Sequence, residues 1–155
     1  MAIATDQGFP QQFAQAMPLW GWALAKSGHG EGRAQVQQIL AASQVMGAPV
    51  HRPYHLALLA EVSAQVGQAA EGLEALAEAL VTLGKSWVRW WEAELYRLRG
   101  ALLLQHTGAQ LGEAEACFQQ ALTVARRQQA QSWELRAAMS LAAPVAAPGQ
   151  AGRHQ

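Results

Sequence analysis

The sequence of 155 residues predicts an all-α fold built from antiparallel helix pairs. Ala, Gln, Leu and Glu dominate between short Gly and Pro interruptions, and β-branched residues are too scattered to form alternating strand patterns. Apolar residues instead recur every three or four positions, as on one face of a helix. A small residue inside four of these segments repeats about every 40 residues, at Gly21, Ala60, Gly100 and Ser140. We therefore expect about three helix pairs followed by one unpaired helix.

The apolar stripes place the helices at residues 10–27, 32–45, 52–66, 69–82, 86–106, 111–128 and 131–143, with no strand. Gly and Pro mark the reversals between them. The fifth helix, WVRWWEAELYRLRGALLL, is expected to begin after an N-cap at Ser86, with Trp87 and Trp91 on its apolar stripe. Glu92 and Glu94 are interpreted as part of a solvated face.

Gly100 lies inside this fifth helix. A glycine there costs roughly 1 kcal/mol relative to alanine. We expect the cost to be offset by a neighbouring helix that packs close to Gly100. The position therefore predicts a site of close helix packing.

The end of the sequence predicts an incomplete array. The segment AAPVAAPGQAGRHQ contains Pro144 and Pro148 and has no helical pattern, so the sequence predicts a repeat domain over residues 1–143 and a disordered tail over residues 144–155. The last helix carries two apolar stripes. The first is expected to pack back on the third pair. The second is expected to lack its covering helix, and this uncapped end predicts self-association. The first stripe is Leu135, Ala138, Met139 and Ala142, and the second is Trp133, Ala137 and Leu141.

Composition excludes several partners. Eleven basic and eleven acidic side chains give a formal charge of zero, so no basic face is expected for nucleic acid. The sequence contains no run of eighteen apolar residues, so no membrane span is predicted. The lone Cys117 excludes a disulfide framework and a cysteine zinc cluster and favours a cytoplasmic location.

No motif indicates catalysis, a metal or a cofactor. Gly84-Lys85-Ser86 lacks the earlier glycine of a phosphate loop and lies between two helices. His51 and His55 are separated by Pro53 and have no third ligand nearby, whereas a catalytic zinc needs three. The sequence therefore predicts a protein that is not an enzyme and carries no metal or cofactor.

The second helices carry a recognisable pattern. Ala114, Phe118 and Ala121 match the A…F…A signature of helix B in the tetratricopeptide repeat, which the helix pairs resemble, although the period exceeds that family's usual value of about 34 residues. The segments WWEAELYRLRG and SWELRAAMSLA are similar to the repeat region of large bacterial regulators that carry a nucleotide-cyclase or signal-transduction ATPase module. This resemblance covers roughly residues 2–142.

The resemblance implies a right-handed superhelical array, a tetratricopeptide-like α-solenoid, with a concave groove lined by the first helices. It implies a non-catalytic protein–protein interaction or scaffold module, a fragment of a multidomain bacterial signalling or transcription regulator. A small-molecule effector sensor is the alternative. A protein or peptide in the groove is expected to contact outward-facing positions of the first helices: Trp22, Lys26, Tyr54, Glu61, Gln65, Glu94, Arg97 and Gln105.

Overall fold

A computed structural model describes residues 10–45, 51–85, 88–106 and 111–143, and within these ranges every regular element is a helix. The all-α prediction is therefore confirmed for the described part of the chain. Most helix ends lie within two residues of their predicted positions. The helices are α2 (Pro10–Lys26), α3 (Glu31–Val45), α4 (Arg52–Gln65), α5 (Ala69–Gly84), α6 (Glu92–Gln105), α7 (Leu111–Arg127) and α8 (Gln131–Ala142).

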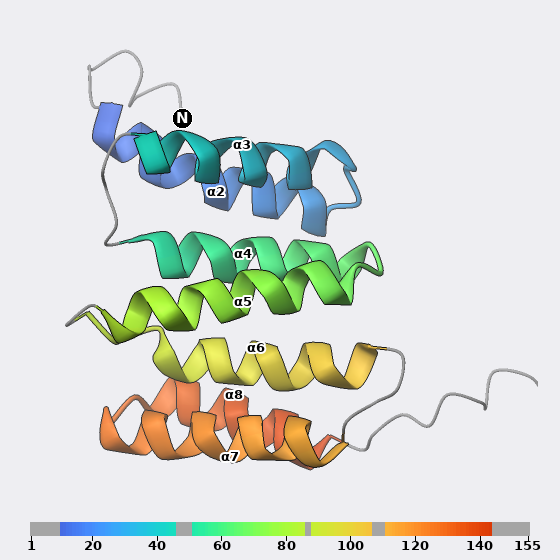
Figure 1. Ribbon diagram of the computed structural model, residues 1–155, viewed down its shortest axis with the longest axis vertical. Helices are drawn as coiled ribbons and strands as arrows, with labels where there is room; N and C mark the ends of the chain where they lie inside the picture. Colours follow the sequence, from blue (N-terminus) through green and yellow to red (C-terminus); the bar gives the residue numbers. More distant parts are fainter. Residues whose placement is uncertain (1–9, 46–50, 86–87, 107–110, 144–155) are drawn as a thin grey trace, which may run out of the picture.

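The helices stack in antiparallel pairs, α2 with α3, α4 with α5 and α6 with α7, and α8 packs on α6 and α7 (Figure 1). Contacts also join α2 to α4, α4 to α6 and α6 to α8. We call these four helices the first-helix row. The arrangement as a right-handed superhelix stays a prediction.

Small residues bring neighbouring helices into close contact. A Cβ atom added at Gly100 of α6 would lie 2.7 Å from Cε1 of Phe118 and 2.9 Å from the carbonyl oxygen of Ala114, both on α7. At Gly72 of α5 it would lie 3.0 Å from a methyl group of Leu102 on α6. The packing expected around Gly100 is present, and the ring of Phe118 occupies the space that a side chain would need.

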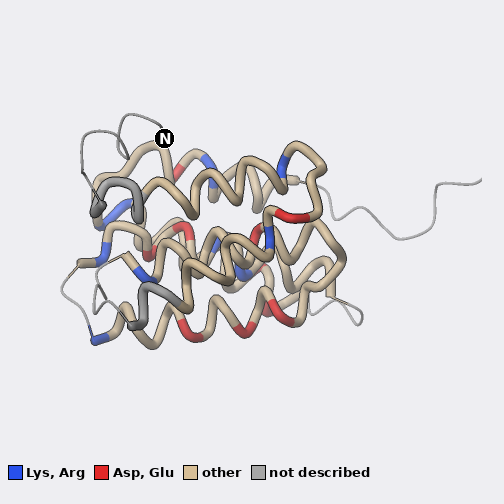
Figure 2. Tube along the Cα trace, turned by 90° about the horizontal axis from the view of Figure 1, so that it is seen from above, with Lys and Arg blue, Asp and Glu red and all other residues tan. Residues whose placement is uncertain are grey.

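Charged residues of both signs are interspersed over the helices (Figure 2). Several of them pair between helices, as Arg33 of α3 does with Glu71 of α5. Arg52 of α4 pairs with Glu78 of α5 in the same way. No helix among the described residues is long and apolar enough to cross a membrane.

The predicted start of the fifth helix is wrong. Helix α6 begins at Glu92 rather than near residue 86, with Trp91 as its N-cap residue. Trp90 and Trp91 lie in a turn, and their ring centroids are 4.9 Å apart. Consecutive residues of a helix do not face each other, so this ring contact requires a backbone that is not helical. The predicted cap Ser86 and Trp87 lie outside the described residues.

The predicted orientation of the last helix is also wrong. Ala137 is buried against Ala121 and Leu122 of α7, with Leu141 beside it. Trp133 packs on Ala93, Val124 and Ala125. The small side chain of Ala137 permits a close approach to α7 that a larger residue would prevent. The stripe expected to be buried is therefore exposed. It consists of Leu135 and Met139, each 63% exposed, with Ala138 and Ala142. The predicted tail, residues 144–155, lies outside the described residues.

Replacing Gly100 by alanine should destabilise the protein. Alanine improves helix propensity by roughly 1 kcal/mol, but its methyl group would overlap Phe118 and the backbone of α7. Overpacking costs typically about 1–3 kcal/mol, so the free energy of unfolding in urea should fall. Gly84→Ala is the matched control, because nothing lies within 4 Å of the added Cβ, and it should leave stability equal or higher. A more stable Gly100→Ala protein would contradict this packing.

A candidate binding site along the first-helix row

A half-open cavity of about 250 Å³ runs along the first-helix row. Its lining comes from all four helices of the row and from Trp91, directly before α6. Four aromatic rings border it together with two carboxylates: Trp22, Tyr54, Trp91 and Trp133, with Glu61 and Glu94. We call this space the row cavity.

Stacked rings form the centre of its wall. The rings of Tyr54 and Trp91 are stacked, with centroids 4.3 Å apart and planes inclined by 26°. Trp91 also contacts Trp133, at 5.3 Å between centroids. The buried indole N–H of Trp91 has no hydrogen-bond partner among the described residues. These contacts join α4, α6 and α8 at one place and fix the aromatic side chains relative to one another.

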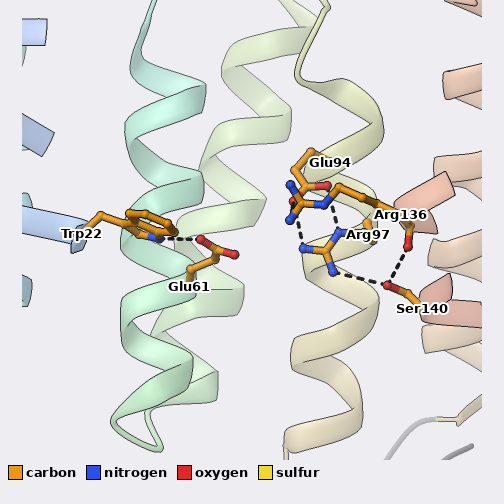
Figure 3. A network of polar contacts seen from close by, with 6 residues as sticks. All are labelled: Trp22, Glu61, Glu94, Arg97, Arg136 and Ser140. Carbon is orange, nitrogen blue, oxygen red and sulfur yellow. Dashed lines mark hydrogen bonds and ion pairs between the residues drawn. The ribbon is translucent and has the colours of Figure 1, made fainter. Parts of the chain in front are cut away.

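On the α2 side of the row cavity, the indole N–H of Trp22 donates a hydrogen bond of 2.5 Å to Oε2 of Glu61 (Figure 3). Glu61 is half-buried and forms no ion pair with any described residue. Burial, and to a smaller extent the negative charge of Glu61, raises the pKa of the Tyr54 phenol above its ordinary value. Glu61 is therefore a fixed carboxylate beside aromatic rings.

On the opposite side, Glu94 bridges two arginines (Figure 3). Nε and Nη2 of Arg97 each donate to its carboxylate at 2.8 Å, and Nη2 of Arg136 approaches it at 2.9 Å. Arg97 also donates to the hydroxyl of Ser140 at 3.3 Å. Burial alone would lower the pKa of Arg97, but the hydrogen bond and charge of Glu94, with the charge of Glu61, outweigh it and raise that pKa. The cluster ties α8 to α6.

The solvated face predicted around Glu92 and Glu94 is therefore wrong. Glu94 is buried beneath Arg97 and Arg136, and Glu92 is buried between Arg89 and Arg127, which approach it at 3.4 and 3.1 Å. Arg97, predicted to face outward, has a side chain that is only 13% exposed, because it is paired with Glu94. Half-buried Tyr54 does reach the row cavity.

The structure brings together four of the eight predicted site residues, Trp22, Tyr54, Glu61 and Glu94, around the row cavity, and Arg97 adjoins it through Glu94. Lys26 and Gln65 lie elsewhere. They line a second cavity of about 330 Å³ near the turn between α2 and α3, although the ammonium of Lys26 sits 5.5 Å from the ring centroid of Trp22. Exposed Gln105, at the end of α6, lines neither cavity.

Sequence reasoning missed part of the lining. The sequence places Trp91 on an apolar stripe and Trp133 on a stripe without a covering helix, yet both are half-buried and border the row cavity. The aliphatic floor was missed although a signal existed, because each of its leucines stands two residues before the repeating small residue. These are Leu19, Leu58 and Leu98. No repeat register indicates Arg136, whose guanidinium lies 5.3 Å from the Trp133 centroid.

The described part of the chain holds no cluster of side chains that could bind a metal ion. His55 is buried, and burial, followed by the charges of His51 and Arg52, lowers its pKa to about 4. Cys117 is half-buried, and burial raises the pKa of its thiol.

Replacing Glu94 by glutamine should lower stability. The substitution removes the carboxylate that pairs with the mostly buried Arg97, and removing one partner of a buried pair is strongly unfavourable. We expect a loss on the order of 2 kcal/mol in urea unfolding, reduced from the fully buried case because Arg136 is half exposed. Glu134→Gln, which breaks the exposed pair with Arg126, should cost no more than about 0.5 kcal/mol. Equal effects would refute a structural role for Glu94.

Comparisons with protein-family models, curated proteins and solved structures found no match to this chain. The resemblance to tetratricopeptide repeats and to bacterial regulators therefore stays a prediction from the sequence, and a function has to be inferred from the geometry of the row cavity.

Proposed function

We propose that the chain is a non-catalytic interaction module whose first-helix row binds a segment of another protein. The observation that carries this proposal is the extent of the row cavity, which receives side chains from α2, α4, α6 and α8. A surface shared by four successive helices suits an extended partner that contacts each helix in turn. Aromatic rings supply contact area at low conformational cost, which favours their use in protein recognition.

The size of the row cavity favours a protein segment over the alternative, a small-molecule effector. Pockets that enclose drug-sized ligands measure about 300–1,000 Å³ and bury most of the ligand. The row cavity is smaller, about 250 Å³, and half open. It has room for one or two side chains of a bound segment, with the rest of that segment lying along the row.

The wider proposal follows the resemblance. The first-helix row is the concave face of a right-handed superhelical array, and the chain is a fragment of a larger bacterial signalling or transcription regulator in the cytoplasm. The contacts of α2 with α4, α4 with α6 and α6 with α8 support this arrangement, because stacked helix pairs interact mainly with their neighbours.

Peptide selection tests the proposed surface. Random dodecapeptides displayed on phage should yield binders, and Leu19→Arg should weaken them at least about tenfold by filling the row cavity. Leu19 lines that cavity and is 44% exposed. Val81→Arg on α5 introduces the same side chain at an exposed site away from the cavity and should leave affinity unchanged. Fluorescence anisotropy of the labelled peptides measures the affinity of both variants.

Weaker binding by Val81→Arg alone would move the binding surface to the second helices and contradict the proposal. Circular dichroism of both variants shows whether the helices remain intact. Saturable binding of a metabolite that excludes the selected peptides would favour the effector sensor instead.

Self-association is a second proposed property, and the uncovered stripe of α8 supports it. Leu135 and Met139 stand four residues apart on one helix face and are each 63% exposed. Replacing both by lysine should reduce concentration-dependent association in sedimentation velocity. Val81→Lys replaces an aliphatic side chain on α5 that is 60% exposed, and it should leave this association unchanged. A monomer at all concentrations would contradict the idea.

A further inference from the structure

The two sides of the row cavity differ in how far their charges are satisfied. On the α6–α8 side, the donors of Arg97 are engaged by Glu94 and Ser140, and Arg136 shares the same carboxylate. On the α2–α4 side, Glu61 accepts one hydrogen bond from Trp22 but forms no ion pair with a described residue, although its charge acts on Arg97 at a distance. A half-buried carboxylate without a direct ion-pair partner attracts a cation more strongly than an exposed one, because less water screens it.

The surroundings of Glu61 suit a long cationic side chain. Tyr54 and Glu61 are seven residues apart on α4, which puts both on one helix face about 10 Å apart along the axis. Ala57 and Leu58 lie between them and line the row cavity. This apolar floor can receive the aliphatic stem of a lysine or arginine, while its charged end meets the carboxylate.

Aromatic rings around the row cavity already interact with cations of the chain itself. The ammonium of Lys26 lies 5.5 Å from the centroid of Trp22, and the guanidinium of Arg136 lies 5.3 Å from that of Trp133. The negative faces of aromatic rings attract such groups. No described cation has this relation to the ring of Tyr54, which lies on the same face of α4 as Glu61, two helical turns away.

We propose that the row cavity recognises a positively charged side chain, lysine or arginine, in the bound protein segment, with Glu61 as its counter-charge, Ala57 and Leu58 beneath its stem, and Tyr54 and Trp22 as aromatic walls. This inference rests on the proposed function and names the chemistry of the partner. An acidic segment is disfavoured because the arginines of the cavity are already paired with Glu94.

Short peptides of matched shape test the charge preference directly. The unaltered ¹⁵N-labelled chain is titrated with acetyl-Gly-Arg-Gly-amide, its citrulline counterpart, which is neutral but has nearly the same shape, and acetyl-Gly-Glu-Gly-amide. The readout is the indole N–H signal of Trp22, identified from the spectrum of Trp22→Phe. The arginine peptide should shift this signal saturably, with an affinity at least about fivefold above that of the citrulline peptide.

A pair of variants tests the role of Glu61. Glu61→Gln keeps an oxygen that can accept the hydrogen bond from Trp22 but removes the charge, so the preference for arginine over citrulline should disappear. Glu74→Gln removes the same charge from an exposed position on α5 and should retain the preference. The titrations of the unaltered chain decide the charge preference even if Glu61→Gln does not fold.

Equal binding of the citrulline peptide, tighter binding of the glutamate peptide, or a preference retained in Glu61→Gln would overturn the inference. So would the absence of any arginine shift up to about 10 mM, ten times the dissociation constant of a 1 mM complex. If selected dodecapeptides bind and are lost in Leu19→Arg while the arginine peptide fails, the proposed function stands and only the cationic specificity is wrong.

Discussion

The close approach of neighbouring helices is the constraint on which the rest of the structure depends. At Gly100 the backbone of α6 lies so near Phe118 and Ala114 of α7 that no side chain would fit. At Gly72 the fit is slightly looser: an added Cβ would lie 3.0 Å from Leu102 of the next pair and 3.1 Å from the carbonyl oxygen of Ala60 within its own pair. Such contacts set the separation between elements, because packed interiors tolerate few voids and few overlaps. Contacts along the first-helix row bring α2, α4, α6 and α8 near enough for one cavity to touch all four.

The sequence predicts this framework well because the information is local. Apolar periodicity locates the helices and their ends to within about two residues in most cases, and the repeat of small residues identifies where helices meet. The need for a partner at Gly100 follows from its cost in a helix, and the structure supplies Phe118 there. Four of the eight predicted site residues border one cavity because they occupy equivalent positions on successive first helices.

The remainder depends on contacts between residues distant in sequence. Trp91 stacks on Tyr54. It lies in a loop before α6, although the periodicity alone predicts that the helix already includes it. The burial of Glu94 depends on Arg136, forty-two positions later. On α8 two apolar stripes compete, and the face with Ala137 is the one that fits against α7. In each case tertiary packing outweighs the local pattern, and nothing in the immediate sequence reveals the partner.

The position of α8 has a thermodynamic consequence for recognition. This helix contributes Trp133 and Arg136 to the row cavity, yet it packs mainly on α6 and α7, and its face with Leu135 and Met139 is uncovered. Docking of α8 and occupancy of the cavity are therefore linked equilibria. Observed affinity scales with the fraction of molecules in which α8 is docked, and a bound segment that touches Trp133 raises that fraction in return. A partner that covers Leu135 and Met139 more tightly when α8 is docked would raise that fraction as well, and would strengthen binding at the cavity without touching it.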